Sequence, residues 1–119
     1  MRTNPSKKVF EESFRIVSAF RQQKDSNALR HYVDPILLCQ WQEEWDSWVQ
    51  TTPKFKIEHF EIGRIWMAKN GVVVEFLGSK EEAGKVSEFS VHWTFNKAQD
   101  RWVVSQIAPA QEQKYAQAA

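Results

Sequence analysis

The chain has 119 residues, of which 42% are hydrophobic, 26% charged and 13% aromatic. These values fit one globular domain whose core needs neither metal nor disulfide, and they exclude a disordered or collagen-like polymer. Sixteen Lys and Arg against fifteen Asp and Glu leave a formal charge of +1, so direct nucleic-acid binding is not expected. Cys39 is the only cysteine, which excludes an intramolecular disulfide and favours a reducing compartment.

Long apolar segments are absent from the sequence. Apolar runs such as residues 36–39 and 72–74 are far shorter than the roughly 18 residues of a membrane-spanning helix. Residues 1–8 carry charges without the apolar stretch of a secretory signal. We therefore expect no transmembrane segment.

The first third of the chain is expected to be helical. Helical spacing relates four apolar residues and predicts an amphipathic helix over about residues 5–23: Phe10, Phe14, Val17 and Phe20. A second, short helix is predicted with Ser26 or Asn27 as its cap and with three residues in its body: Ala28, Leu29 and Tyr32.

A third helix is predicted to begin with Asp34 as its N-cap and Pro35 in its first turn. Its apolar residues fall on one side: Leu37, Leu38, Trp41, Trp45 and Trp48. Its other side is polar: Gln40, Glu43, Glu44 and Ser47. Cys39 lies within the apolar stretch with no cation beside it in sequence, so we expect a buried, unreactive thiol.

After Pro53 the pattern alternates, which predicts strands. The apolar phase changes between Ile57 and Phe60, so the first strand is expected to carry a bulge near His59 or a bend at Gly63. The pair Asn70-Gly71 predicts a tight hairpin turn between two apolar segments, residues 64–68 and 72–77. Residues 78–85 are expected to form a polar loop.

The next strand alternates strictly. Phe89, Val91, Trp93 and Phe95 share one face, and the other face is polar: Glu88, Ser90, His92 and Thr94. A turn over residues 96–100 leads to a last strand over residues 101–107.

The order of elements predicts an α+β domain, with three N-terminal helices packed on a curved four-stranded antiparallel sheet. A single domain is expected over residues 1–109, and residues 110–119 are expected to be a frayed or disordered tail.

Motifs for enzymes, metals and cofactors are missing from the sequence, so no catalytic residue, metal or cofactor is assigned. His59 and His92 are the two histidines that can approach each other across the sheet. Four strand glutamates can supply a carboxylate beside them: Glu58, Glu61, Glu75 and Glu88. Because charges on one face of an antiparallel sheet are normally exposed, these groups are expected to face solvent. The alternative is an acid–base site in which His59 or His92 is the base and a glutamate orients it.

Six tryptophans are the most unusual feature of the composition. They either fill a close-packed core or line a concave apolar cavity. The residues expected to line such a cavity, and to bind a partner there, are Trp41, Trp45, Trp66, Phe76 and Trp93.

Two further surfaces are candidates for partners. Basic residues beside the aromatic stripe of the first helix suggest contact with an anionic membrane surface: Lys7, Lys8 and Arg15. The polar face of the sheet suggests a homodimer interface: Val73, Glu75, Ser90 and His92.

Three segments resemble the nuclear-transport-factor-two-like superfamily, and within it the Tim-forty-four-like family. They are residues 26–38 (SNALRHYVDPILL), residues 91–95 (VHWTF) and residues 101–107 (RWVVSQI). The family comprises a peripheral subunit of the mitochondrial presequence translocase and bacterial relatives, and the resemblance extends from about Lys8 to Ile107.

The resemblance implies a cone-shaped, non-enzymatic binding domain. Such a domain is membrane-peripheral or a subunit of a larger assembly, and its concave apolar face meets a protein segment or a lipid. It implies a location on the matrix side of the mitochondrial inner membrane or in the bacterial cytoplasm. The superfamily also contains isomerases and dehydratases that use the cavity, and a small cavity enzyme is therefore the alternative.

Overall fold

The structure, a computed structural model, describes residues 7–69 and 71–109. Three helices come first: α1 (Lys7–Gln22), α2 (Ser26–Leu29) and α3 (Pro35–Thr51). Four strands follow: β1 (Phe55–Ala68), β2 (Gly71–Glu82), β3 (Lys85–Ala98) and β4 (Arg101–Pro109). The strands form one antiparallel sheet in the order β1-β2-β3-β4. The predicted α+β class is confirmed, whereas the tail expected over residues 110–119 lies outside the described residues.

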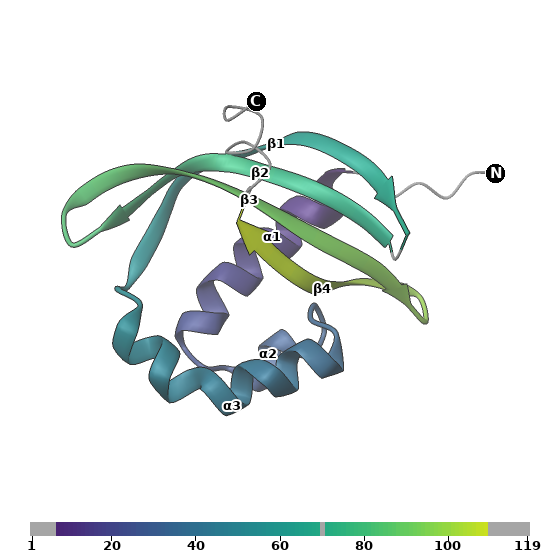
Figure 1. The fold of residues 1–119 in the computed structure, drawn as a ribbon, viewed down its shortest axis with the longest axis horizontal. Coiled ribbons are helices and arrows are strands. Elements are labelled where there is room, and N and C mark those ends of the chain that lie inside the picture. The colour runs from purple at the N-terminus through teal and green to yellow at the C-terminus, as the bar shows by residue number, and fades with distance from the viewer. Residues whose placement is uncertain (1–6, 70, 110–119) are drawn as a thin grey trace, which may run out of the picture.

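The sheet is arched, and the helices occupy its concave side. Figure 1 shows α1 reaching up to the sheet while α3 lies below it. Backbone hydrogen bonds fix this arrangement at the start of α3. Asp34 N donates to Val104 O, and Val104 N donates to Tyr32 O, each over 2.9 Å. The segment before α3 is thus joined directly to β4.

The cap of α2 differs from the expectation. Asp25, and neither Ser26 nor Asn27, is the N-cap, and its carboxylate accepts a hydrogen bond from Ala28 N at 3.1 Å. The helix begins one residue earlier than the sequence suggested, so its first free N–H groups point at Asp25. At α3 the prediction is confirmed, because Asp34 accepts from Ile36 N at 3.0 Å and Pro35 begins the helix.

The expected apolar stripe of α3 faces the sheet. Leu38, Trp41 and Trp45 are buried, and Leu37 and Trp48 are partly buried against the core. The expectation of a buried Cys39 is wrong, because its side chain is exposed. Each helical residue is rotated by about 100° from the one before, so Cys39 is turned away from Leu38 while Trp41 returns to the buried side.

Two irregularities in β1 bend the sheet. The register of β1 with β2 shifts between Ile57 and His59 and again between Ile62 and Ile65, which confirms both the bulge near His59 and the bend around Gly63. Gly78 of β2 lies opposite the first shift. A Cβ atom at Gly78 would lie 2.8 Å from the Cα of Phe60, so only glycine permits this close approach of the two strands.

The hairpins are tight. Ala68 pairs with Gly71, which confirms the predicted tight hairpin, although Gly71 is the first residue of β2 and not a residue of the turn. The expected loop over residues 78–85 is wrong, because β2 continues to Glu82 and β3 begins at Lys85. Only Ala83 and Gly84 connect them, with φ of 52° and 81°, values typical of a turn that matches the twist of two long strands.

The centre of the core is Phe14 of α1. Its ring lies 4.3 Å from that of Phe76, 4.7 Å from Phe60 and 4.9 Å from Trp93, measured between centroids. One helical side chain therefore packs against the three strands β1, β2 and β3. The edge-on and offset contacts among these rings add to the free energy of burial.

Replacing Phe14 by Ala should lower the free energy of unfolding by about 4 kcal/mol, because it removes a buried ring and leaves a cavity among aromatic neighbours. Val86→Ala is the control, since Val86 is 65% exposed in the β2–β3 hairpin and should change stability by less than about 0.5 kcal/mol. Urea denaturation followed by tryptophan fluorescence measures both. A loss at Phe14 no larger than at Val86 would contradict the central role of this ring.

Candidate functional site

A small pocket of about 170 Å³ opens under the concave face of the sheet, between α1 and the end of α3. Most of its walls are apolar side chains, among them Phe14, Val17, Trp48, Ile57, Val91 and Trp93. Within the described chain, its polar wall residues are Ser18, Arg21 and Lys80. We call this space the apolar pocket.

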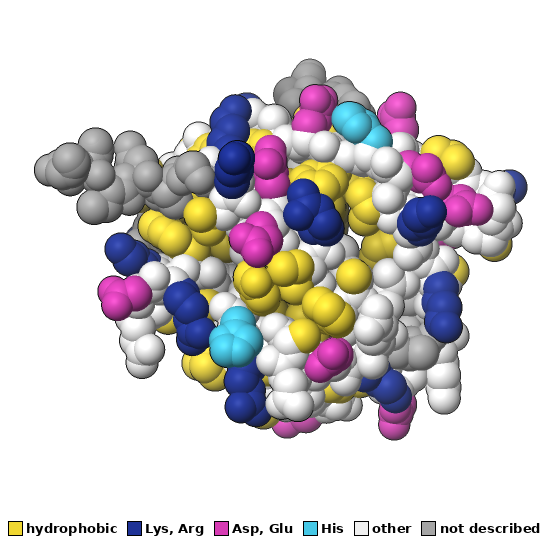
Figure 2. Space-filling view, turned by 180° about the vertical axis from the view of Figure 1, so that it is seen from behind, with side chains coloured by type: hydrophobic (Ala, Val, Ile, Leu, Met, Phe, Trp, Pro, Cys, Tyr) yellow, Lys and Arg dark blue, Asp and Glu magenta, His cyan; other side chains and the backbone are white. Residues whose placement is uncertain are grey.

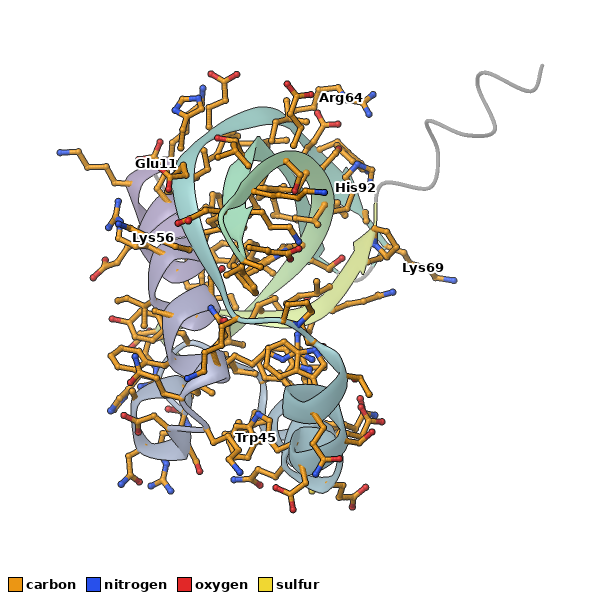
Figure 3. All side chains as sticks on the ribbon, turned by 90° about the vertical axis from the view of Figure 1, so that its left-hand side faces the viewer. Glu11, Trp45, Lys56, Arg64, Lys69 and His92 are labelled. Carbon is orange, nitrogen blue, oxygen red and sulfur yellow. The ribbon has the colours of Figure 1, made fainter. Side chains whose placement is uncertain are left out.

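A wider groove of about 670 Å³ adjoins the apolar pocket and shares Ser18, Phe55 and Ile57 with it. This outer groove runs between α1 and the start of β1, and its rim carries three cations and one carboxylate: Arg15, Lys54, Lys56 and Glu58. Figure 3 shows Lys56 of β1 beside α1, on the same side of the molecule as Glu11. The predominance of cations on this rim favours anionic groups.

Gln22 fixes the end of the outer groove. Its side-chain oxygen accepts from Phe55 N at 2.9 Å, and its side-chain nitrogen donates to Phe55 O at 3.0 Å. The amide of Gln22 thus replaces a neighbouring strand at the start of the edge strand β1. These two bonds hold α1 and β1 at the separation that leaves the groove between them.

Arg21 is the most unusual side chain of the apolar pocket. Its guanidinium carbon lies 4.1 Å from the ring centroid of Trp41 and 4.3 Å from that of Trp48. Burial lowers the pKa of Arg21 to about 10, partly opposed by the charge of Glu44. Its Nε atom is buried and has no hydrogen-bond acceptor among the described residues.

The residues expected to line a cavity are divided between two faces. Trp93 lines the apolar pocket, whereas Trp41, Trp45 and Phe76 are buried in the core cluster beside it. Trp45 lies between the helices in Figure 3. Trp66 is on the opposite face of the sheet, where its ring meets that of His92 at 5.2 Å, so it does not line the pocket. Partner binding by these residues stays a prediction.

Sequence reasoning missed Arg21, although a signal was present. Arg21 follows Val17 by four residues and therefore continues the apolar stripe of α1. An arginine in such a stripe has to place its charge in the protein interior or at its border. The structure brings this residue against two tryptophans of α3, which spacing alone does not predict.

The outer face of the sheet holds a buried acid and a buried histidine. Glu75 and His92 are each 6% exposed, so the expectation that they face solvent is wrong, while Glu58, Glu61 and Glu88 are exposed as predicted. Glu75 Oε1 accepts from Arg64 N at 3.2 Å, and Glu75 Oε2 lies 3.6 Å from His92 Nε2. Gly63 gives the carboxylate its space, because a Cβ there would be 2.5 Å from Glu75 Oε1.

The acid–base pair that a cavity enzyme needs is not in the apolar pocket. Strand alternation places Glu75 and His92 on the face opposite to Val74 and Trp93, which belong to the core. Figure 3 shows His92 and Arg64 at the end of the molecule opposite to Trp45 and α3. His59 is exposed and pairs with Ser79, four residues along β2 from Glu75, so the two histidines are not brought together.

The basic residues of α1 and the polar face of the sheet were also predicted to contact partners. Lys7, Lys8 and Arg15 are exposed on α1, where contact with a membrane stays a prediction. Three of the residues proposed for a dimer face are buried within the chain: Val73, Glu75 and His92. They are therefore not an open interface. Figure 2 shows hydrophobic side chains gathered near the centre of the rear face, with both signs of charge around them.

The described residues contain neither a cluster of metal ligands nor a helix that could span a membrane. Among residues 7–69 and 71–109, no three His, Cys, Asp or Glu side chains are grouped so as to hold a metal ion. None of the three helices in these ranges is long and apolar enough to cross a membrane.

Replacing Glu75 by Ala should lower the free energy of unfolding by about 2 kcal/mol, because it removes charged hydrogen bonds from a buried position. Glu61→Ala is the matched control, since Glu61 is an exposed glutamate of the neighbouring strand and should change stability by less than about 0.5 kcal/mol. Denaturant unfolding of both variants tests this, and equal losses would contradict a stabilising role for the Glu75 contacts.

Comparison with known proteins identifies the fold. No family model and no curated protein matches the sequence. The intermembrane space region of the chloroplast protein ARC6 has a similar structure, with a TM-score of 0.69 and 8% identity over 91% of this chain and 100% of that one. A SEC-C motif containing protein from Rhodopseudomonas palustris is also similar, with a TM-score of 0.57 and 17% identity over 77% of this chain and 71% of that one. The chain therefore has the α+β fold of the ARC6 intermembrane space region.

Proposed function

We propose that the chain is a Tim-forty-four-like domain that acts as a non-enzymatic binding module. In this proposal the apolar pocket holds an apolar chain of a partner, either a segment of a protein or a lipid. The domain works at a membrane surface or as a subunit of a larger assembly, on the matrix side of the mitochondrial inner membrane or in a bacterial cytoplasm.

The apolar pocket is the observation that carries this proposal. Concave, mostly apolar spaces with a few polar groups are where proteins bind small molecules and anchor side chains. At about 170 Å³ the pocket is below the size typical of a whole ligand, so it suits one end of a larger partner that continues along the outer groove. The likeness to a region that lies in the intermembrane space of chloroplasts supports work beside a membrane.

The chemistry of the pocket supports binding over catalysis. Its described walls carry a hydroxyl, a guanidinium and an ammonium but no carboxylate or imidazole. General acid–base catalysis by a His–Glu pair would need both groups within hydrogen-bond reach of a substrate. The Glu75–His92 pair lies on the other face of the sheet.

The first test uses 1-hexanol as an uncharged apolar probe, followed by NMR of the tryptophan indole N–H groups. Hexanol should shift the signals of Trp48 and Trp93, which line the apolar pocket, and leave that of Trp66 unchanged. Val91→Phe should abolish these shifts by filling the pocket, whereas Val86→Phe in the exposed hairpin should retain them. Absence of shifts at Trp48 and Trp93 up to the solubility limit of hexanol would overturn the proposal.

The second test measures membrane contact by co-sedimentation with phosphatidylcholine vesicles, with and without phosphatidylglycerol. Replacing Lys7, Lys8 and Arg15 together by Gln should weaken binding to anionic vesicles by roughly 100-fold at low salt, since each cation contributes about 1 kcal/mol. Replacing three exposed cations elsewhere, Lys85, Lys97 and Arg30, is the control. Equal binding by the two triple variants, or no binding by the wild type, would remove the membrane surface from the proposal.

A further inference from the structure

Arg21 is a partly buried cation whose hydrogen-bonding capacity is incompletely used. Its Nε atom is shielded from solvent without an acceptor in the described part of the chain. Buried donors in native proteins normally have a partner, so this N–H remains able to donate to an acceptor that enters the pocket. Trp45 Nε1 on α3 is a second buried donor without an acceptor among the described residues.

The stacking of Arg21 on two tryptophans leaves its N–H groups able to bind an anion. Its guanidinium carbon lies over the rings of both Trp41 and Trp48, at 4.1 and 4.3 Å from their centroids. A guanidinium that stacks on aromatic rings can still donate hydrogen bonds in its own plane, which is the geometry of carboxylate recognition. Glu44 acts on Arg21 only through its charge, and the structure records no ion pair between them.

The other cation of the apolar pocket is already paired. Lys80 Nζ lies 3.1 Å from Glu82 Oε2 and also 5.2 Å from the ring centroid of Phe55. An anion entering the pocket would therefore find Arg21 without a competing carboxylate. Because the site is desolvated, an ion pair there is stronger and less screened by salt than one on the surface.

The walls around Arg21 favour an acyl chain over a peptide. A peptide carries an N–H and a C=O at each residue, which must be hydrogen-bonded when buried. Apart from Arg21 and Lys80, the described pocket wall offers only the hydroxyl of Ser18 among its polar side chains. An alkyl chain has no such groups, and about 170 Å³ is roughly the volume of five or six water molecules, enough for a short chain.

We propose that Arg21 binds the carboxylate of a fatty acid whose alkyl chain fills the apolar pocket. This inference rests on the proposed function and names the ligand class of the same pocket. A chain longer than the pocket would continue into the outer groove, which shares Phe55 and Ile57 with it. Arg21 would then select acids over alcohols and amines of the same length.

The experiment compares three probes of equal length at pH 7: hexanoate, 1-hexanol and hexylammonium. Their dissociation constants are measured from the indole N–H shifts of Trp48 and Trp93, together with the Nε–H signal of Arg21. The wild type should bind hexanoate about tenfold more tightly than hexanol, because a hydrogen bond to a charged group is added. Hexylammonium should bind more weakly than hexanol, since its charge meets Arg21.

Variants of Arg21 test whether this residue causes the preference for hexanoate over hexanol. Arg21→Met should bind hexanoate no more tightly than hexanol, and Arg21→Lys should retain a reduced preference for the acid. Arg30→Met is the control, because Arg30 is an exposed arginine that lines neither the apolar pocket nor the outer groove, and it should keep the wild-type preference. The comparison of the three probes on the wild type needs no variant and remains decisive if Arg21→Met does not fold.

The outcomes separate this inference from the proposed function. Equal binding of hexanoate and hexanol to the wild type, or a preference that survives in Arg21→Met, overturns the carboxylate site and leaves an apolar pocket. Equal loss of the preference in Arg30→Met assigns it to general surface charge and also overturns the site. Failure of both probes to shift Trp48 and Trp93 overturns the proposed function itself.

Discussion

The packing of Phe14 inside the arched sheet is the contact on which the rest of the structure depends. In a flat sheet, β1, β2 and β3 would lie beside different residues along α1, so the ring of Phe14 could not contact all three strands. The register shifts in β1, with Gly78 opposite the first of them, bend the sheet until Phe60, Phe76 and Trp93 surround Phe14. Curvature set by the backbone and burial of one helical side chain thus stabilise each other.

The apolar pocket follows from how the helices are attached. α1 is fixed to the sheet by Phe14 and to the start of β1 by the amide of Gln22. α3 is fixed at its beginning by the bonds of Tyr32 and Asp34 to Val104, and near its end Trp48 approaches α1 through Arg21. Between these attachments no large side chain fills the space under Ile57, Val91 and Trp93. Arg21, which stacks on Trp41 and Trp48, lines one side of that space.

The two faces of the sheet separate two kinds of chemistry. On the concave face, aromatic and aliphatic groups surround one stacked cation, an arrangement suited to holding an apolar chain with an anionic end. On the outer face, Glu75 and His92 are buried against Gly63 and Trp66, where they contribute to the stability of the sheet. Glu75 and His92 are therefore remote from the apolar pocket, whose polar wall residues in the described chain are Ser18, Arg21 and Lys80, whereas Glu58 and His59 line the outer groove.

Local sequence patterns predicted the class of the fold and most of its elements, but not the length of the β2–β3 hairpin or the cap of α2. Helical spacing in α1 and α3, the Asp34-Pro35 start, the phase change in β1 and the alternation of β3 are all local patterns, so short-range propensities and burial periods specify them. The position of the site depended on contacts distant in sequence. Cys39 within an apolar stretch proved exposed, Trp66 and Trp93 proved to be on opposite faces, and Glu75 and His92 proved buried. The burial of these side chains depends on tertiary packing, because the curvature of the sheet and the positions of α1 and α3 determine which side of each element is covered. Arg21 likewise contacts Trp41 and Trp48 only when both helices are packed on the sheet.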